Sequence, residues 1–216
     1  MDIVKNFELI NKNLPDKVKI IAVSKTKPTE KILEIYNIGH RDFGENRIQE
    51  LKRKYEELPK DIKWHMIGHL QKNKVKYIAP FINLIHAVDS IKLLTEINKQ
   101  AIKNKRTIDC LLQIKIAREE SKFGLSENKV GDLILSSQDL KNIRIVGLMG
   151  MATFTDNPEI INTEFQGLSD LYKNLKVSNP QISVLSIGMS NDYLIAINNG
   201  SNMVRIGSQI FGERNK

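Results

Sequence analysis

The most constraining feature of this sequence is the regular return of short apolar runs rich in β-branched residues. Eight such runs occur at intervals of roughly twenty to thirty residues, and we interpret each as a buried strand. They cover residues 18–24, 40–44, 62–68, 84–88, 108–116, 144–149, 183–187 and 203–206. The segments between them carry apolar residues at spacings of three and four, as in Leu93, Leu94, Ile97 and Ala101, which is typical of amphipathic helices.

The alternation of strand and helix continues along the whole chain. It predicts an α/β fold with a parallel sheet that closes on itself, a (β/α)8 barrel of the TIM type. No Pro-, Gly- or Ser-rich linker divides the chain, so we expect one domain over residues 1–216; a doubly wound open sheet is the alternative. Only about ten residues follow the eighth strand, too few for a closing helix, and residues 1–13 are expected to form a helix on the barrel exterior instead.

The composition is that of an ordinary globular domain, with 41% apolar and 27% charged residues. The formal net charge is +8, but the lysines are dispersed over helix-like segments such as 50–60 and 71–76, and we interpret most of them as solvated. No segment reaches the ~18 apolar residues of a membrane span, and no signal-peptide core is present. We therefore expect a cytoplasmic protein that binds neither nucleic acid nor membrane. Cys110 lies in an apolar run, where burial is expected, and no metal-ligand spacing occurs.

Lys25 ends the first apolar run, in the segment KIIAVSKTKP at 19–28, and helix-start residues follow directly. In a barrel, the carboxyl ends of the strands form the active face, and the loops after strands seven and eight often hold phosphate. Glycine and serine follow both of those strands here: Gly188 and Ser190 after the seventh, Gly207 and Ser208 after the eighth. Such loops offer an anion a tight turn, hydroxyl groups and backbone N–H groups.

A lysine amine opposite a phosphate-binding pair of loops is the arrangement that pyridoxal phosphate requires. That cofactor joins an aldehyde to a phosphate through one rigid ring. The same residues also suit a phosphosugar isomerase or aldolase, in which Lys25 would attack a sugar carbonyl. The residues alone leave both interpretations open.

Seven motifs, in this order along the chain, resemble those of one family. They are AVSKTKP (22–28), FGENRIQE (43–50), WHMIGHLQKNK (64–74), EESKFGL (119–125), GLMGMA (147–152), GMSND (188–192) and VRIGSQIFGER (204–214). As a set they closely resemble the pyridoxal phosphate homeostasis proteins, the YggS/PROSC family. That resemblance implies a pyridoxal phosphate barrel of fold type III, like the N-terminal domain of alanine racemase but without the additional β domain.

The resemblance assigns expected roles to residues at the mouth of the barrel. It implies that Lys25 holds pyridoxal 5′-phosphate as an internal aldimine, a Schiff base. It further places Ser190, Gly207 and Ser208 at the phosphate, and Asn46 beside the ring.

Arg205 is implied to face the pyridine nitrogen of the cofactor. A guanidinium stays protonated, so it would keep that nitrogen unprotonated and make the ring a poorer electron sink. Without the family resemblance, Arg205 reads as a salt-bridged residue inside the barrel.

The implied function is intracellular homeostasis or carriage of pyridoxal phosphate, a form of vitamin B6, with little or no catalysis. The alternative is a fold type III amino-acid racemase, lyase or decarboxylase in which Lys25 doubles as the base. The implied partners are pyridoxal phosphate itself, amino acids and client enzymes that need it. We expect a monomer.

Four residues depart from the usual family pattern: Lys115, Thr153, Ile187 and Asn202. Of these, Lys115 is the one expected near the cofactor mouth, where it would add a positive charge. The four histidines lie in or beside strand runs, and we interpret them as structural hydrogen-bonding groups. They are His40, His65, His69 and His86.

Overall fold

The computed structural model describes residues 2–119 and 122–213. Within these residues a closed, all-parallel barrel of eight strands runs in chain order, with β8 returning to pair with β1. The strands are β1 (Lys19–Val23), β2 (Asp42–Glu45), β3 (Lys63–Met66), β4 (Leu84–Val88), β5 (Ile108–Ile114), β6 (Ile143–Gly150), β7 (Val184–Met189) and β8 (Met203–Ile206). The barrel prediction is confirmed, and the open-sheet alternative is wrong. Glu120, Ser121 and Arg214 of the sequence motifs lie outside the described residues.

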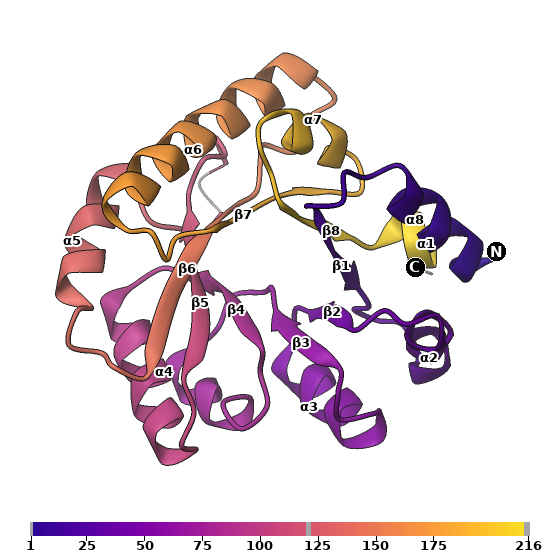
Figure 1. Ribbon diagram of the computed structural model, residues 1–216, viewed down its shortest axis with the longest axis horizontal. Coiled ribbons are helices and arrows are strands. Elements are labelled where there is room, and N and C mark those ends of the chain that lie inside the picture. Colours follow the sequence, from indigo (N-terminus) through magenta and orange to yellow (C-terminus); the bar gives the residue numbers. More distant parts are fainter. Residues whose placement is uncertain (1, 120–121, 214–216) are drawn as a thin grey trace.

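The helices form an outer ring around the strands, as Figure 1 shows. They are α1 (Ile3–Lys12), α2 (Thr29–Asn37), α3 (Ile48–Glu57), α4 (Ile91–Lys103), α5 (Val130–Ser136), α6 (Pro158–Ser178), α7 (Tyr193–Asn198) and α8 (Ser208–Phe211), with 3₁₀ helices η1 (Lys72–Tyr77) and η2 (Glu127–Lys129). The sequence explains two of the starts. Ser90 caps α4 by accepting from the amide of Leu93 at 3.4 Å, and Asn157 caps α6 with Pro158 at its first position.

The strands are apolar because helices cover the outside of the barrel and side chains fill the inside. Every residue of β4 and of β8 is buried. Successive side chains along a strand point to opposite faces, so Met203 and Arg205 share one face of β8 and Val204 and Ile206 the other. A small apolar cluster that includes Ile21, Leu111 and Met203 is separate from the large core under the helices.

The two ends of the chain lie next to each other at one side of the barrel (Figure 1). Helix α1 buries Ile3, Phe7 and Ile10, and the side-chain amide of Asn6 donates to the carbonyl of Ile210 in α8 at 3.3 Å. The expected absence of a helix after the eighth strand is wrong, because α8 forms one helical turn there. Four residues suffice for that turn because α1 supplies the neighbouring apolar surface.

Candidate functional site

The predicted site residues follow, or lie in, four strands that are neighbours in the closed barrel. Strand β8 pairs with β7 on one side and with β1 on the other, and β1 pairs with β2. Lys25 follows β1, Asn46 follows β2 and Ser190 follows β7. Since all strands are parallel, their carboxyl ends open at the same face, and the four loops meet there. The remaining site residues belong to β8 and its loop: Arg205, Gly207 and Ser208.

Lys25 lies in a sharp turn between β1 and α2. The amide of Ser24 donates to the carbonyl of Gly44 at 3.1 Å, which continues the pairing of β1 with β2. Directly after Lys25, Thr26 has a φ of 65°, in the left-handed region that non-glycine residues seldom adopt. The turn then closes when Lys27 donates its amide to the carbonyl of Ser24 at 3.0 Å.

The loops after β7 and β8 are joined by hydrogen bonds centred on Ser190. Its hydroxyl accepts from the amide of Gly207 at 3.1 Å, and its carbonyl accepts from the side chain of Gln209 at 2.6 Å. A hydroxyl that accepts one hydrogen bond keeps its own proton for donation. The predicted phosphate-binding residues are therefore adjacent, and the hydroxyl of Ser190 retains a donor.

Gly188 makes the loop after β7 sterically possible. Its φ is 94°, and an added Cβ would lie 2.6 Å from the Cβ of Ala196 and 2.9 Å from the Cα of Tyr193. Both the conformation and the close approach of α7 require glycine. The amide of Met189 donates to Asp192 Oδ1 at 2.5 Å, which completes the turn. The sequence-based interpretation of Gly188 as the residue of a tight turn is confirmed.

Arg205 is buried inside the barrel, with 4% of its surface exposed. Its Nη1 donates to the carbonyl and to the hydroxyl of Ser186 at 2.7 and 2.9 Å, and its Nη2 donates to the carbonyl of Gly150 at 2.9 Å. These acceptors are all neutral, in contrast to the salt bridge that the residue type alone suggested. Burial lowers the pKa of Arg205 to about 10, so the guanidinium stays charged at neutral pH.

A chain of hydrogen bonds leads from Arg205 across the barrel interior. Ser186 Oγ lies 3.3 Å from His86 Nδ1, and His86 Nε2 lies 2.9 Å from His65 Nδ1. His65 Nε2 in turn lies 3.0 Å from Asp42 Oδ1. One proton arrangement satisfies every contact: His65 donates to Asp42, His86 donates to His65, and Ser186 donates to His86 while it accepts from Arg205. Both imidazoles are neutral in this arrangement.

The pKa values of this chain agree with neutral imidazoles. Burial lowers the pKa of His65 despite its hydrogen bond to Asp42, and burial lowers that of His86 well below the usual range. Burial alone would raise the pKa of Asp42, but the hydrogen bond from His65 and the nearby charge of Lys19 bring it to about 2. His65 and His86 therefore make buried hydrogen bonds, as expected from the sequence; that they serve structure and not catalysis stays a prediction.

We expect acid to destabilise the protein through these histidines. An unfolded histidine has a pKa of about 6.5, so below that pH the unfolded chain binds protons that folded His65 and His86 do not. As the pH falls below 6.5, each of the two histidines lowers the free energy of unfolding by up to about 1.4 kcal/mol per pH unit. Urea unfolding at pH 8, 6.5 and 5.5 measures this loss. Burial raises the pKa of Glu45, so the folded state binds this proton at a higher pH than the unfolded chain does, and Glu45 acts in the opposite direction as the pH falls.

Imidazole NMR shifts measure the protonation of the two histidines directly. We expect those of His86 to stay constant from pH 7.5 to 5.5, and any titration of His65 to fall below the usual histidine pKa of about 6.5. A titration of either ring near pH 6.5 would contradict the neutral chain.

The side chain of Asn46 has a buried hydrogen-bond acceptor. Its Oδ1 is buried and makes no hydrogen bond to the described residues. The loop after β3 packs closely against the backbone of Asn46, because a Cβ on Gly68 would lie 2.4 Å from the backbone carbonyl oxygen of Asn46. A buried acceptor without a partner is costly, so a ligand donor at this place would satisfy it.

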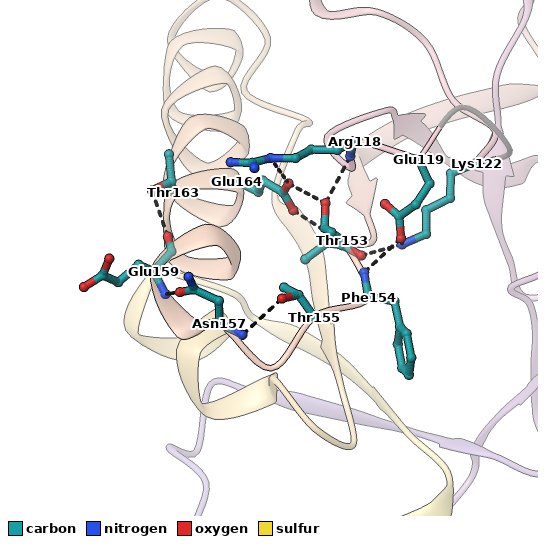
Figure 2. Close-up of polar contacts among 11 residues, drawn as sticks. Arg118, Glu119, Lys122, Thr153, Phe154, Thr155, Asn157, Glu159, Thr163 and Glu164 are labelled. Carbon is teal, nitrogen blue, oxygen red and sulfur yellow. Dashed lines mark hydrogen bonds and ion pairs between the residues drawn. The ribbon is translucent and has the colours of Figure 1, made fainter.

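A polar cluster joins the loops after β5 and β6, as Figure 2 shows. Thr153 donates its amide and its hydroxyl to the two carboxylate oxygens of Glu164 at 2.7 and 2.6 Å, and it accepts from the amide of Arg118 at 3.0 Å. Lys122 pairs with Glu119 at 2.9 Å and donates to the carbonyl of the residue before Thr153 at 2.6 Å. In the family that the motifs resemble, a proline often follows GLMGMA at this position, and proline has neither the amide proton nor the hydroxyl for these bonds.

The other three departures from the family pattern lie just before β8, within β7 and just after β5. Asn202 accepts from the amide of Leu185 at 2.9 Å and donates to the carbonyl of Ser183 at 2.7 Å, so it joins β7 to the start of β8. Ile187 is fully buried. Lys115 is exposed just after the end of β5.

One group of residues near Lys25 was missed by sequence reasoning: Glu45, Glu50 and Lys54 form an ion cluster beneath the turn. We interpreted most lysines of segment 50–60 as solvated, but Lys54 is fully buried. The sequence does contain a sign that Lys54 is buried, because it follows Ile48 and Leu51 at a spacing of three, on the buried face of α3.

Three further findings concern metal binding, the single cysteine and membrane spans. Within residues 2–119 and 122–213, no group of histidine, cysteine, aspartate or glutamate side chains has the geometry to hold a metal ion. Cys110 is fully buried, as expected, and burial raises the pKa of its thiol. In the described part of the chain, none of the helices has the length and apolar character needed to cross a bilayer.

Comparison with known sequences identifies close relatives. The model of the alanine racemase N-terminal domain matches residues 2–215 of this chain. A pyridoxal phosphate homeostasis protein of Aquifex aeolicus (strain VF5) is 41% identical over 198 residues, which cover 91% of this chain and 87% of that protein. One from Schizosaccharomyces pombe is 40% identical over 200 residues, covering 91% and 84%.

Solved structures also resemble this chain. PipY of Synechococcus elongatus PCC7942, determined with pyridoxal phosphate bound, is 31% identical and superposes with a TM-score of 0.90, covering 98% of this chain and 100% of that one. An alanine racemase of Clostridium difficile 630 has a TM-score of 0.84 at 15% identity, and this chain spans 60% of its length. The likeness to the racemase is one of fold.

Proposed function

This chain belongs to the pyridoxal phosphate homeostasis proteins, a family built on the alanine racemase N-terminal domain, and we propose from this membership that it binds pyridoxal 5′-phosphate covalently on Lys25 and serves in its homeostasis or carriage. The observation that carries the proposal is the meeting of the Lys25 turn with the joined Ser190 and Gly207 loops at adjacent strand ends. When bound, the cofactor supplies an aldehyde that condenses with an amine, and a ring that can accept electrons.

The residues present fit this ligand. Ser190 keeps a hydroxyl proton to donate to a phosphate, and Gly207 and Ser208 bring backbone and hydroxyl groups to the same place. Asn46 has a buried amide oxygen with no partner in the described chain, next to the Lys25 loop. Arg205 holds a fixed positive charge inside the barrel, and we assign it to the ring nitrogen.

We further propose that catalytic turnover is weak or absent. A charged Arg205 donates a hydrogen bond to a ring nitrogen without giving up a proton, which leaves the ring a poor electron sink. Exchange of the cofactor with amino acids or client enzymes is then the function, carried out by a cytoplasmic monomer that forms one domain over residues 1–216. Amino-acid-dependent exchange of an α-proton with solvent deuterium would instead indicate a racemase or lyase.

The absorption spectrum of the purified protein, with and without added pyridoxal phosphate, tests the binding proposal. We expect a new band that borohydride removes, with the added mass on the peptide that contains Lys25. A protein that shows neither the band nor the mass gain at saturating cofactor would overturn the proposal.

A further inference from the structure

A fully buried lysine lies beneath the turn that carries Lys25. The side chain of Lys54, on α3, has no exposed surface, and neither has that of Glu45, while 15% of the Glu50 side chain is exposed. The ammonium of Lys54 donates to the carbonyl of Ser24 at 2.8 Å and to Oε1 of Glu45 and of Glu50, both at 2.7 Å. These three acceptors use all three donors of the ammonium. A buried charge is tolerated only when it is paired in this way.

The cluster binds both residues that flank Lys25. Ser24 is held twice, because its carbonyl accepts from Lys54 and its hydroxyl donates to Glu45 Oε1 at 2.6 Å. The amide of Thr26 donates to Glu50 Oε1 at 2.7 Å. The residue between these two fixed neighbours is Lys25 itself.

The cluster also offsets the strain of the turn. A φ of 65° at Thr26 is unfavourable for a β-branched residue, and such conformations persist only where surrounding contacts enforce them. The bond from the Thr26 amide to Glu50 is such a contact, and Lys54 fixes Glu50 in turn. Loss of Lys54 would therefore release both sides of the turn together.

We propose that Lys54 is a positioning residue for Lys25: together with Glu45 and Glu50 it holds Ser24 and Thr26, so that the Lys25 amine stays at one place in the barrel mouth. This inference rests on the proposed function, because its purpose is to keep that amine ready for the covalent link. Lys54 itself does not touch the ligand in this scheme. It acts through the backbone on either side of Lys25.

The test removes the buried ammonium without leaving a fully buried carboxylate unpaired. In the double variant Lys54→Met/Glu45→Gln we expect at least tenfold weaker pyridoxal phosphate binding and slower formation of the borohydride-reducible link. The second readout needs no ligand: the peptide containing Thr26 should take up deuterium at least tenfold faster than in the wild-type protein. A role in stability alone would lower the melting temperature and change neither quantity.

A second pair of variants keeps the inference testable if the double variant does not fold. Glu50→Gln retains an oxygen that accepts from the Thr26 amide, so binding and deuterium uptake should stay within twofold of wild type. Glu50→Ala removes that acceptor and leaves Lys54 paired one-to-one with Glu45, so both measurements should change in the direction of the double variant. Equal behaviour of Gln and Ala at position 50 would contradict the proposal.

Arg106 provides a matched control. It is a half-buried cation that donates to the carbonyls of Ala79 and Ile82, both at 2.7 Å. Arg106→Met should lower the melting temperature while cofactor binding and Thr26 exchange remain as in the wild type.

The outcomes separate the two proposals. A wild-type protein that forms no reducible link overturns the proposed function and, with it, the purpose assigned to Lys54. The inference about Lys54 alone is overturned by a different result. In that case the wild type forms the reducible link, and a folded Lys54→Met/Glu45→Gln variant shows unchanged cofactor binding and unchanged deuterium exchange at Thr26.

Discussion

Replacement of Lys25 by alanine should abolish the borohydride-stable link between this protein and pyridoxal phosphate. The turn after β1 places one amine between two fixed neighbours, Ser24 and Thr26, and alanine leaves that turn without a nucleophile. We expect the visible band to vanish and the mass gain on the peptide containing residue 25 to fall below detection. Absorption spectra before and after borohydride, followed by peptide mass mapping, measure both.

Lys27 is the matched control for this experiment. Its ammonium donates to the carbonyls of Phe211 and Gly212, both at 3.0 Å, so it fastens the turn to the end of the chain. Lys27→Ala should lower the melting temperature and still give the reducible adduct on Lys25. An adduct that persists on the same peptide in Lys25→Ala, or disappears in a folded Lys27→Ala, would show that Lys25 is not the anchor.

The fold was largely predictable from the sequence because a closed parallel barrel buries its strands on both faces. Each strand therefore reads as a short apolar run, and β4 and β8 were predicted with the observed bounds, 84–88 and 203–206. The ends of the other six strands differ from the predicted ones by at most two residues. Helix α8 was missed because it forms only against α1, from the opposite end of the chain, and a local pattern does not contain that contact.

The site was predictable where a single residue type determines the local backbone. Gly188 was identified as a turn residue because the left-handed conformation and the close approach of α7 both demand glycine. The partners of Lys54 and of His86 were not predictable, because they lie on other strands and helices. The sequence shows which groups are present, and only the closed barrel determines which of them meet.

Two buried polar networks therefore lie under the mouth of the barrel. The ion cluster of Lys54 lies under the Lys25 turn, while the chain of neutral side chains from Ser186 through the two histidines, which ends at the Asp42 carboxylate, lies under Arg205. Hydrogen bonds between buried polar groups restrict the geometry of the residues that they join; in the ion cluster these bonds fall on Glu45 Oε1, while Glu45 Oε2 has no partner among the described residues. Separate networks thus hold the Lys25 turn and the Arg205 guanidinium, and the joined loops after β7 and β8, where we propose that the phosphate binds, form a third fixed part of the proposed site.

Simultaneous replacement of Ser190 and Ser208 by alanine should weaken retention of pyridoxal phosphate more than any other change at the phosphate loops. Each hydroxyl is expected to donate one hydrogen bond to a charged phosphate, worth roughly 1 to 2 kcal/mol. Loss of both should raise the dissociation constant by about 30- to 1,000-fold. Equilibrium dialysis after competition with a small amine, and retention during gel filtration, measure the affinity.

Ser190 should contribute the larger share of this loss. Its hydroxyl also accepts from the Gly207 amide, so alanine there both removes a phosphate donor and loosens the loop after β8. The matched control is Ser201→Ala, because the Ser201 hydroxyl is also buried between β7 and β8 but donates to the backbone carbonyl of Ile187 at 2.7 Å. That variant should be less stable and bind the cofactor normally. The double variant loses both side-chain hydroxyls that we assign to the phosphate. Unchanged affinity in Ser190→Ala/Ser208→Ala would therefore mean that the phosphate binds elsewhere in the mouth of the barrel.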